Sequence, residues 1–248
     1  MKIIEAEHYQ DMSEKAARFI IEKVNGLSAP VLGLATGGTP LGTYKCLRED
    51  HLSHKTAYQH VYTVNLDEYV GLAPYDENSY TFYMKKHLFH HIGIPSSHTY
   101  LPNGMAADLT AECERYEALI ERLGGVDLQL LGLGLNGHIG FNEPGTPFSS
   151  KTHVVELTES TRKANARYFD SLSSVPTKAV TMGISTIMKS KQILLLVSGA
   201  NKAGILARLL SEEPHEGTPA SVLNMHENVV IIADRDALSA VKERSMIF

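Results

Sequence analysis

Three residues that could transfer or hold a proton stand close together in one glycine-rich segment. Asn136, His138 and Glu143 lie in LLGLGLNGHIGFNEPGTPF, residues 130–148, directly after an apolar run. Histidine suits proton transfer near neutral pH, and a carboxylate in the same loop would hold the imidazole and fix its tautomer. A structural turn with a hydrogen-bonded histidine is the alternative. The number of polar residues that follow the apolar run favours a catalytic role for this segment over a purely structural one.

A second carboxylate pair ends another apolar run, in VNLDEYVGL at residues 64–72. A carboxylate at the end of a strand can act as a general base. Neighbouring side chains on a strand point to opposite faces, so only one of Asp67 and Glu68 need face a given pocket. Taken alone, the pair could also be a solvated charged turn.

A possible anion site lies in VLGLATGGTPLGTY, residues 31–44. Paired glycines let backbone N–H groups approach an anion, and Pro40 fits the first turn of a following helix whose N-terminus favours negative charge. No GK[ST] follows, so this is not a Walker A loop. An ordinary strand–turn–helix connection is the alternative. The residues expected to contact a phosphate are Thr36, Gly37, Gly38 and Thr39.

Two basic residues could complete such a site. Arg167 lies in a helical-looking segment, residues 160–169, and Lys202 begins a helix after the run Ile193–Val197. A lysine in the first turn opposes the helix dipole, and an anionic ligand would relieve that cost. Each residue taken alone is better explained as a solvent-exposed charge.

The elements that must position these residues alternate along the chain. Short apolar runs rich in Val, Ile and Leu predict strands buried on both faces of a parallel sheet, and helix-length segments separate them. The sequence therefore predicts an α/β fold, a single domain over residues 1–248 with an open, mostly parallel sheet and helices on both faces (Rossmann-like, three layers). The predicted strands are Val31–Ala35, Val61–Leu66, Leu128–Leu133, Ile193–Val197 and Val229–Ala233; the predicted helices are Tyr9–Val24, Leu41–Arg48, Ser79–Phe89, Ala107–Leu123 and Lys202–Leu210.

Composition excludes several classes of function. A net charge of −5, with 43% hydrophobic and 21% charged residues, is ordinary for a globular protein and offers no basic surface for nucleic acid or an anionic membrane. Two cysteines, Cys46 and Cys113, fit a reducing compartment. The acidic N-terminus is no signal peptide, and the apolar runs are too short to span a bilayer. We expect a cytoplasmic protein.

Two other motifs are set aside. Gly132-x-Gly134-x-x-Gly137 formally matches a dinucleotide fingerprint, but glycines and prolines follow where a helix should open. His87, His90 and His91 could share a helix face, yet the glutamate of a zinc-binding HExxH motif is missing. We therefore expect no cofactor and no metal.

Several motifs together resemble those of the glucosamine-6-phosphate deaminases. They are ATGGTP at 35–40, NLDEYVGL at 65–72, GHIGFNEPG at 137–145, TRKANARYF at 161–169 and GANKA at 199–203. The second and third are quite specific, whereas related 6-phosphogluconolactonases share a glycine-rich turn like the first. The resemblance implies an aldose–ketose isomerisation coupled to deamination, in which glucosamine 6-phosphate and water give fructose 6-phosphate and ammonia.

The resemblance also implies a role for each residue. His138 would open the pyranose ring, Glu143 would orient that imidazole, and Asp67 would move a proton between C2 and C1. The phosphate would be held by Thr36, Gly37, Gly38, Thr39, Arg167 and Lys202. The choice of Asp67 over Glu68 rests on the family motif, since a one-residue shift of the strand would exchange their faces.

The chain departs from the better-known family pattern. Position 136 is asparagine where some members carry aspartate, so the electrostatic role passes to Glu143. Allosteric members have basic residues after the catalytic loop where this chain has His153 and Val155, and they continue beyond the position of Phe248. We expect weak or absent allostery, a monomer or small homo-oligomer, and a lid at about residues 149–172 that brings Arg167 onto the phosphate.

Two rival functions stay open at this point. A 6-phosphogluconolactonase would share the fold and phosphate loop but would need no base at C2. A non-catalytic sugar-phosphate sensor would have no use for Asp67, His138 and Glu143, and it would need a DNA-binding segment for which the sequence offers no basic stretch.

Overall fold

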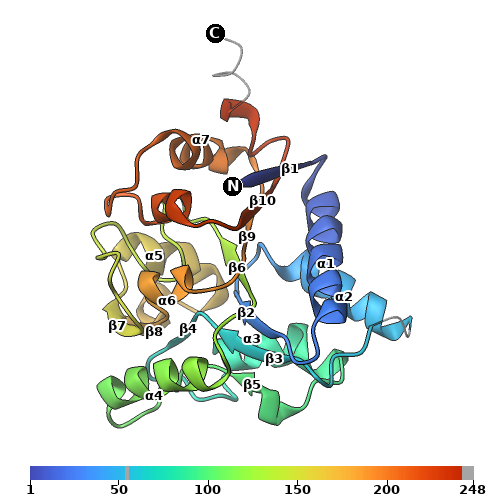
Figure 1. Cartoon of the computed structure of the whole chain (residues 1–248). Helices are drawn as coiled ribbons and strands as arrows, with labels where there is room; N and C mark the ends of the chain where they lie inside the picture. Colours follow the sequence, from blue (N-terminus) through green and yellow to red (C-terminus); the bar gives the residue numbers. More distant parts are fainter. Residues whose placement is uncertain (54–55, 242–248) are drawn as a thin grey trace.

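The central element of the structure, a computed structural model that describes residues 1–53 and 56–241, is a seven-stranded sheet. All its strand pairs are parallel, in the order β1-β10-β9-β6-β2-β3-β5 (Figure 1). The predicted mostly parallel α/β fold is thus confirmed. The strands are β1 (Lys2–Ala6), β2 (Val31–Leu34), β3 (Tyr62–Asn65), β5 (Thr99–Tyr100), β6 (Leu128–Gly132), β9 (Ile193–Val197) and β10 (Val229–Asp234).

Side chains that alternate along each strand build a separate core on either face of this sheet. In β9, Leu194 and Leu196 pack on one face, and Leu195 and Val197 pack on the other. Burying one such side chain contributes about 1.5–3 kcal/mol, which explains why these runs are continuously apolar. The first face is covered by α1 (Tyr9–Gly26), α2 (Leu41–Leu52) and α3 (Tyr80–His87), and the second by α4 (Leu109–Arg122), α6 (Ile184–Met188) and α7 (Ala203–Ser211).

A second, three-stranded antiparallel sheet was not predicted. It pairs β4 (Asp67–Tyr69) with β8 (Lys178–Thr181), and β8 with β7 (His153–Glu156) (Figure 1). These strands are short and lack long apolar runs, so periodicity does not reveal them. Only Leu66 separates β3 from β4, and the chain therefore passes from the large sheet to the small one at Asp67.

The helix expected over residues 160–169 is shorter than predicted. Helix α5 spans Glu159–Asn165, and a 3₁₀ turn over Ala166–Tyr168 carries Arg167. Residues 139–152 contain no helix and no named strand.

No helix in residues 1–53 and 56–241 is long and apolar enough to cross a membrane. Within the same ranges, no three His, Cys, Asp or Glu side chains are grouped so that they could hold a metal ion.

Candidate active site

A cleft of about 630 Å³ opens where β2, β3, β6 and β9 end. The carboxyl ends of parallel strands are the usual place for ligands in open α/β sheets. Nine of the ten residues selected from the sequence line this cleft, and the tenth, Glu143, lies behind it. The nine are Thr36, Gly37, Gly38, Thr39, Asp67, Asn136, His138, Arg167 and Lys202.

Asp67 lines the cleft at the point where β4 begins, and it is buried. Its Oδ2 approaches Gly140, where an added Cβ would stand only 3.6 Å away, and the φ of +57° at Gly140 also favours glycine. Burial, together with the charge of Glu68, raises the pKa of Asp67 to about 8. A carboxylate with so high a pKa is a stronger base than an exposed one once it is ionised.

Glu68 points to the other face of β4 and has a structural role. It accepts hydrogen bonds from the backbone N–H groups of Tyr69, Tyr80 and Thr81 at 2.8–2.9 Å, and from the Thr81 hydroxyl at 2.9 Å. Two of these N–H groups belong to the first turn of α3, where no helical partner exists for them. The structure therefore places Asp67, and not Glu68, in the cleft.

The imidazole of His138 lies directly against the backbone of Gly134. A Cβ at position 134 would come within 2.4 Å of ring atom Cδ2, so only glycine leaves room for the ring. Gly137 takes a φ of +87°, which turns the loop back between these two residues. The Gly134 N–H then donates to the His138 carbonyl at 2.9 Å. The glycines of this loop thus serve to place a histidine, not a dinucleotide.

Glu143 lies behind His138, with its Oε2 3.6 Å from Nδ1 of the ring. Asn136 donates to the same oxygen at 2.6 Å, and the buried hydroxyl of Thr161 donates to Oε1. Burial alone would raise the pKa of Glu143, but His138 and the hydrogen bonds from Thr161 and Asn136 outweigh it and lower that pKa to about 2. Glu143 is therefore a fixed negative charge beside the imidazole.

Asn136 acts on the imidazole indirectly. Its amide nitrogen holds Glu143, and its Oδ1 accepts from the backbone N–H of His138 at 3.2 Å. The asparagine thus orders the carboxylate and the loop backbone together, without contacting the ring by a hydrogen bond.

The opposite end of the cleft is basic. The guanidinium of Arg167 lies over the ring of Tyr168 at 4.7 Å, and its Nη2 is 3.9 Å from where a Cβ on Gly38 would stand. Lys202 donates from Nζ to the carbonyl of Leu133 at 2.6 Å. Burial and the nearby Arg167 both lower the pKa of Lys202. In the described part of the chain neither cation pairs with a carboxylate, so this end suits an anion.

The glycine-rich turn after β2 is fixed from outside by two tyrosines. Tyr83 donates to the carbonyl of Gly37 at 2.6 Å, and Tyr9 donates to the carbonyl of Gly38 at 3.0 Å. Gly37 takes a φ of +91°, a backbone conformation that residues with a side chain rarely adopt. These hydrogen bonds fix the backbone of the turn at the basic end of the cleft.

Sequence reasoning missed several residues of the site. Thr161 lies within the TRKANARYF motif, and it donates a hydrogen bond to Glu143 that the motif itself does not indicate. Ser198 and Asn201 follow β9 and line the cleft beside Lys202, and the rule that ligands bind at strand ends could have selected them. Tyr80 also lines the cleft, but it is distant in sequence from every strand end and nothing in the sequence marks it.

The sequence of the chain is similar to those of proteins of one known family. Residues 5–232 match the sequence profile of the glucosamine-6-phosphate isomerases/6-phosphogluconolactonases. The chain is 62% identical to a glucosamine-6-phosphate deaminase of Geobacillus sp. (strain WCH70), over 98% of this chain and 97% of that protein. It is 53% identical to glucosamine-6-phosphate deaminase 1 of Bacillus subtilis (strain 168), over 96% of this chain and 99% of that one.

Solved structures agree with the sequence relatives. A structure described as a monomeric glucosamine-6-phosphate deaminase superposes with a TM-score of 0.95 at 53% identity, covering 97% of this chain and all of that one. A 6-phosphogluconolactonase from Thermotoga maritima shares the fold, with a TM-score of 0.75, 22% identity and coverage of 94% and 99%. The chain belongs to the glucosamine-6-phosphate isomerase/6-phosphogluconolactonase family and, within it, to the glucosamine-6-phosphate deaminases.

Proposed function

We propose that this protein converts D-glucosamine 6-phosphate and water to D-fructose 6-phosphate and ammonia. The observation that carries the proposal is the arrangement of the cleft: a buried carboxylate base and a carboxylate-backed histidine face an anion site whose two cations pair with no carboxylate in the described part of the chain. Relatives more than 50% identical over nearly the whole chain bear the name of this activity.

The phosphate binds at the basic end, between the turn at residues 36–39 and the side chains of Arg167 and Lys202. Anchoring a substrate at a group remote from the reacting carbons places those carbons against fixed catalytic groups, which can lower a barrier by several kcal/mol. His138 then moves a proton from the anomeric hydroxyl to the ring oxygen, and the pyranose opens to the aldehyde. Glu143 stabilises the imidazolium formed on the way.

Asp67 carries out the isomerisation. Its carboxylate removes the proton from C2, the C1 carbonyl oxygen gains a proton, and an enolamine forms. The same carboxyl group returns the proton to C1, which gives the 2-imine of fructose 6-phosphate. Water adds to C2 and ammonia leaves, so the overall reaction consumes one water and involves no change in redox state.

A direct assay tests this proposal. The purified protein is supplied with glucosamine 6-phosphate alone, and ammonia and fructose 6-phosphate are measured separately. We expect both products in equal amounts from the wild-type protein and a loss of at least about a thousandfold in kcat for Asp67→Asn. Absence of either product from the wild-type protein would refute the proposal.

The same preparation should be tested on 6-phosphogluconolactone, because lactonases share this fold. A lactonase needs no base at C2, so Asp67→Asn would leave most of such an activity intact. We expect the lactone to be hydrolysed no faster than in buffer.

We further propose that the protein acts as a monomer in the cytoplasm and that its place in metabolism is the breakdown of amino sugars. A relative 53% identical to it is described as monomeric, which supports the first point. Cys46 and Cys113 are both free thiols, as in a reducing compartment. The roles given to the individual site residues, and the lid at about residues 149–172, belong to the same proposal.

A further inference from the structure

The loop that carries Asn136, His138 and Glu143, residues 133–148, depends on neighbours for its shape because it contains no regular element. On one side it is tied to β8, where Phe141 N–H donates to the Thr181 hydroxyl at 3.1 Å. On the other side it is tied to residues 215–221, here called the support segment. The carbonyl of Gly137 accepts from Ala220 N–H at 2.8 Å, and Gly145 N–H donates to the Glu216 carbonyl at 2.8 Å.

The contact at Gly137 is the one closest to the histidine. A Cβ on Gly137 would stand 2.7 Å from the methyl group of Thr218, so the fully buried threonine packs directly on the residue that precedes His138. Thr218 therefore limits where Gly137 can lie, and with it the backbone that leads to the imidazole.

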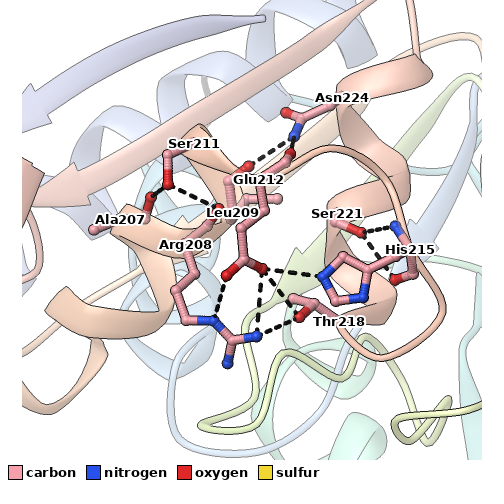
Figure 2. A network of polar contacts seen from close by, with 9 residues as sticks. All are labelled: Ala207, Arg208, Leu209, Ser211, Glu212, His215, Thr218, Ser221 and Asn224. Carbon is pink, nitrogen blue, oxygen red and sulfur yellow. Dashed lines mark hydrogen bonds and ion pairs between the residues drawn. The ribbon is translucent and has the colours of Figure 1, made fainter.

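The support segment begins outside any helix or strand and is itself fixed by one carboxylate at the end of α7. Figure 2 shows Glu212 between Arg208, His215 and Thr218. Its oxygens accept from Arg208 Nε at 2.8 Å and from the Thr218 hydroxyl at 3.3 Å, and Nε2 of His215 lies 3.2 Å away. Arg208 Nη2 also donates to the Thr218 hydroxyl at 2.8 Å, which closes a ring of three residues.

Further bonds fix the backbone on either side of this ring. The Ser221 hydroxyl bonds both the N–H and the carbonyl of His215, at 2.9 and 3.1 Å. Hydrogen bonds from Arg208 and His215 lower the pKa of Glu212 to about 2, so the group is a carboxylate throughout the neutral range. The network is partly exposed, and its role is therefore one of geometry more than of overall stability.

We infer that Glu212, through Thr218, is a positioning residue for His138: the ring of Glu212, Arg208 and Thr218 sets the place of Gly137 and so the orientation of the imidazole. The inference rests on the proposed deaminase activity for its kinetic test. No atom of this network lines the cleft, and the phosphate is held by other elements, so the effect falls on turnover and not on substrate binding.

The test compares Glu212→Ala with Glu213→Ala, which removes the same charge from the adjacent, exposed position. We expect kcat to fall about fivefold in Glu212→Ala while KM changes less than about twofold, since displacement of a catalytic group by a fraction of an ångström costs turnover. Glu213→Ala should match the wild type. Glu212→Gln, which keeps the length and one acceptor oxygen, should recover part of the rate.

Two further measurements make the test decisive. The NMR signals of the His138 ring should shift in Glu212→Ala and stay in place in Glu213→Ala, which a loss of stability alone would not produce. Thr218→Val keeps the buried methyl contact but removes the hydroxyl, and it should lower kcat as Glu212→Ala does. It also decides the matter if Glu212→Ala fails to fold.

Unchanged kcat and unchanged His138 signals in folded Glu212→Ala or Thr218→Val would overturn the inference. An equal loss of kcat in Glu213→Ala would overturn it too, because the effect would then come from removing a negative charge and not from the contacts of Glu212. If the wild-type protein itself shows no turnover, the proposed function fails separately, and the His138 signals alone decide the inference.

Discussion

Asp67, the proposed base, occupies a position that lowers the stability of the fold. Its carboxyl group is buried where the chain passes from the large sheet to the small one, and this burial, together with the charge of Glu68, raises its pKa to about 8. The neighbouring Glu68 has four donors that stabilise its charge, whereas no group in the described part of the chain donates a hydrogen bond to the Asp67 carboxyl. A base left unsatisfied in this way is reactive, and the folded state bears the cost.

The pH dependence of stability follows from that pKa. In the unfolded chain the carboxyl titrates near 3.8, and in the folded protein near 8, so between these values unfolding releases a proton and folding stability falls as pH rises. Asparagine does not titrate. Asp67→Asn should therefore be more stable than the wild type in urea unfolding, by roughly 4 kcal/mol at pH 7 and by less than about 1 kcal/mol at pH 4.

Glu68→Gln is the matched control for this experiment. An amide nitrogen there would face donors that now bond an oxygen, so the variant should be less stable than the wild type at pH 7. A stability difference for Asp67→Asn that is negative, or that does not grow with pH, would contradict the explanation.

Thr161 offers a second test at a single residue. Its hydroxyl is one of the donors that keep Glu143 ionised beside His138. Thr161→Val preserves the buried volume but removes that donor, so the pKa of Glu143 should rise and kcat should fall about tenfold with little change in KM. Thr161→Ser keeps the hydroxyl and should retain most of the rate. Steady-state kinetics that rank serine no better than valine would refute this role.

At the scale of elements, the sequence predicts what depends on long apolar runs. The runs at 31–35, 128–133 and 193–197 correspond to β2, β6 and β9, and they place the glycine-rich turn, the histidine loop and Lys202 at one edge. The small sheet escapes prediction because β4, β7 and β8 have three or four residues each and mixed polarity. Its consequence is the burial of Asp67, a property that no local pattern could indicate.

The structure also narrows the range of residues that the expected lid would include. Strand β7 is paired with β8 over four residues, so residues 153–156 are held in a sheet. The part that could move begins near Thr158 and carries Arg167 on its 3₁₀ turn. Arg162 fixes the C-terminal end of this segment by donating hydrogen bonds to the carbonyls of Leu172 and Val175 at 2.9 and 3.0 Å.

Hydrogen exchange measures whether this segment closes on a ligand. With saturating fructose 6-phosphate, amides of residues 158–172 should exchange at least about threefold more slowly, because the phosphate would hold Arg167. Amides of β7 should change little. In Arg167→Gln the slowing should disappear from 158–172 although the ligand is still supplied in excess. Equal exchange in the wild-type protein with and without the ligand would argue against a lid.

At the scale of the molecule, the edges of the large sheet bear on assembly. A long, flat, apolar edge strand would invite pairing with a second copy. Edge strand β5 has only two residues, and the other edge, β1, carries the charged Lys2 and Glu5. Nine of the ten residues selected from the sequence line one cleft of this chain.

A single complete site in a single chain predicts simple kinetics, because cooperativity requires two sites whose states are coupled. Light scattering should give a molar mass near the 27.3 kDa of one chain, at protein concentrations that include those of the assay. The rate should rise hyperbolically with glucosamine 6-phosphate, and N-acetylglucosamine 6-phosphate should not raise it at low substrate concentration. A sigmoidal curve that the acetylated sugar phosphate makes hyperbolic would show coupled sites, and a mass several times larger would show the assembly that couples them. The same two measurements on Glu212→Ala distinguish coupled sites from a displaced His138, since a positioning defect lowers the plateau of the rate curve without changing its shape.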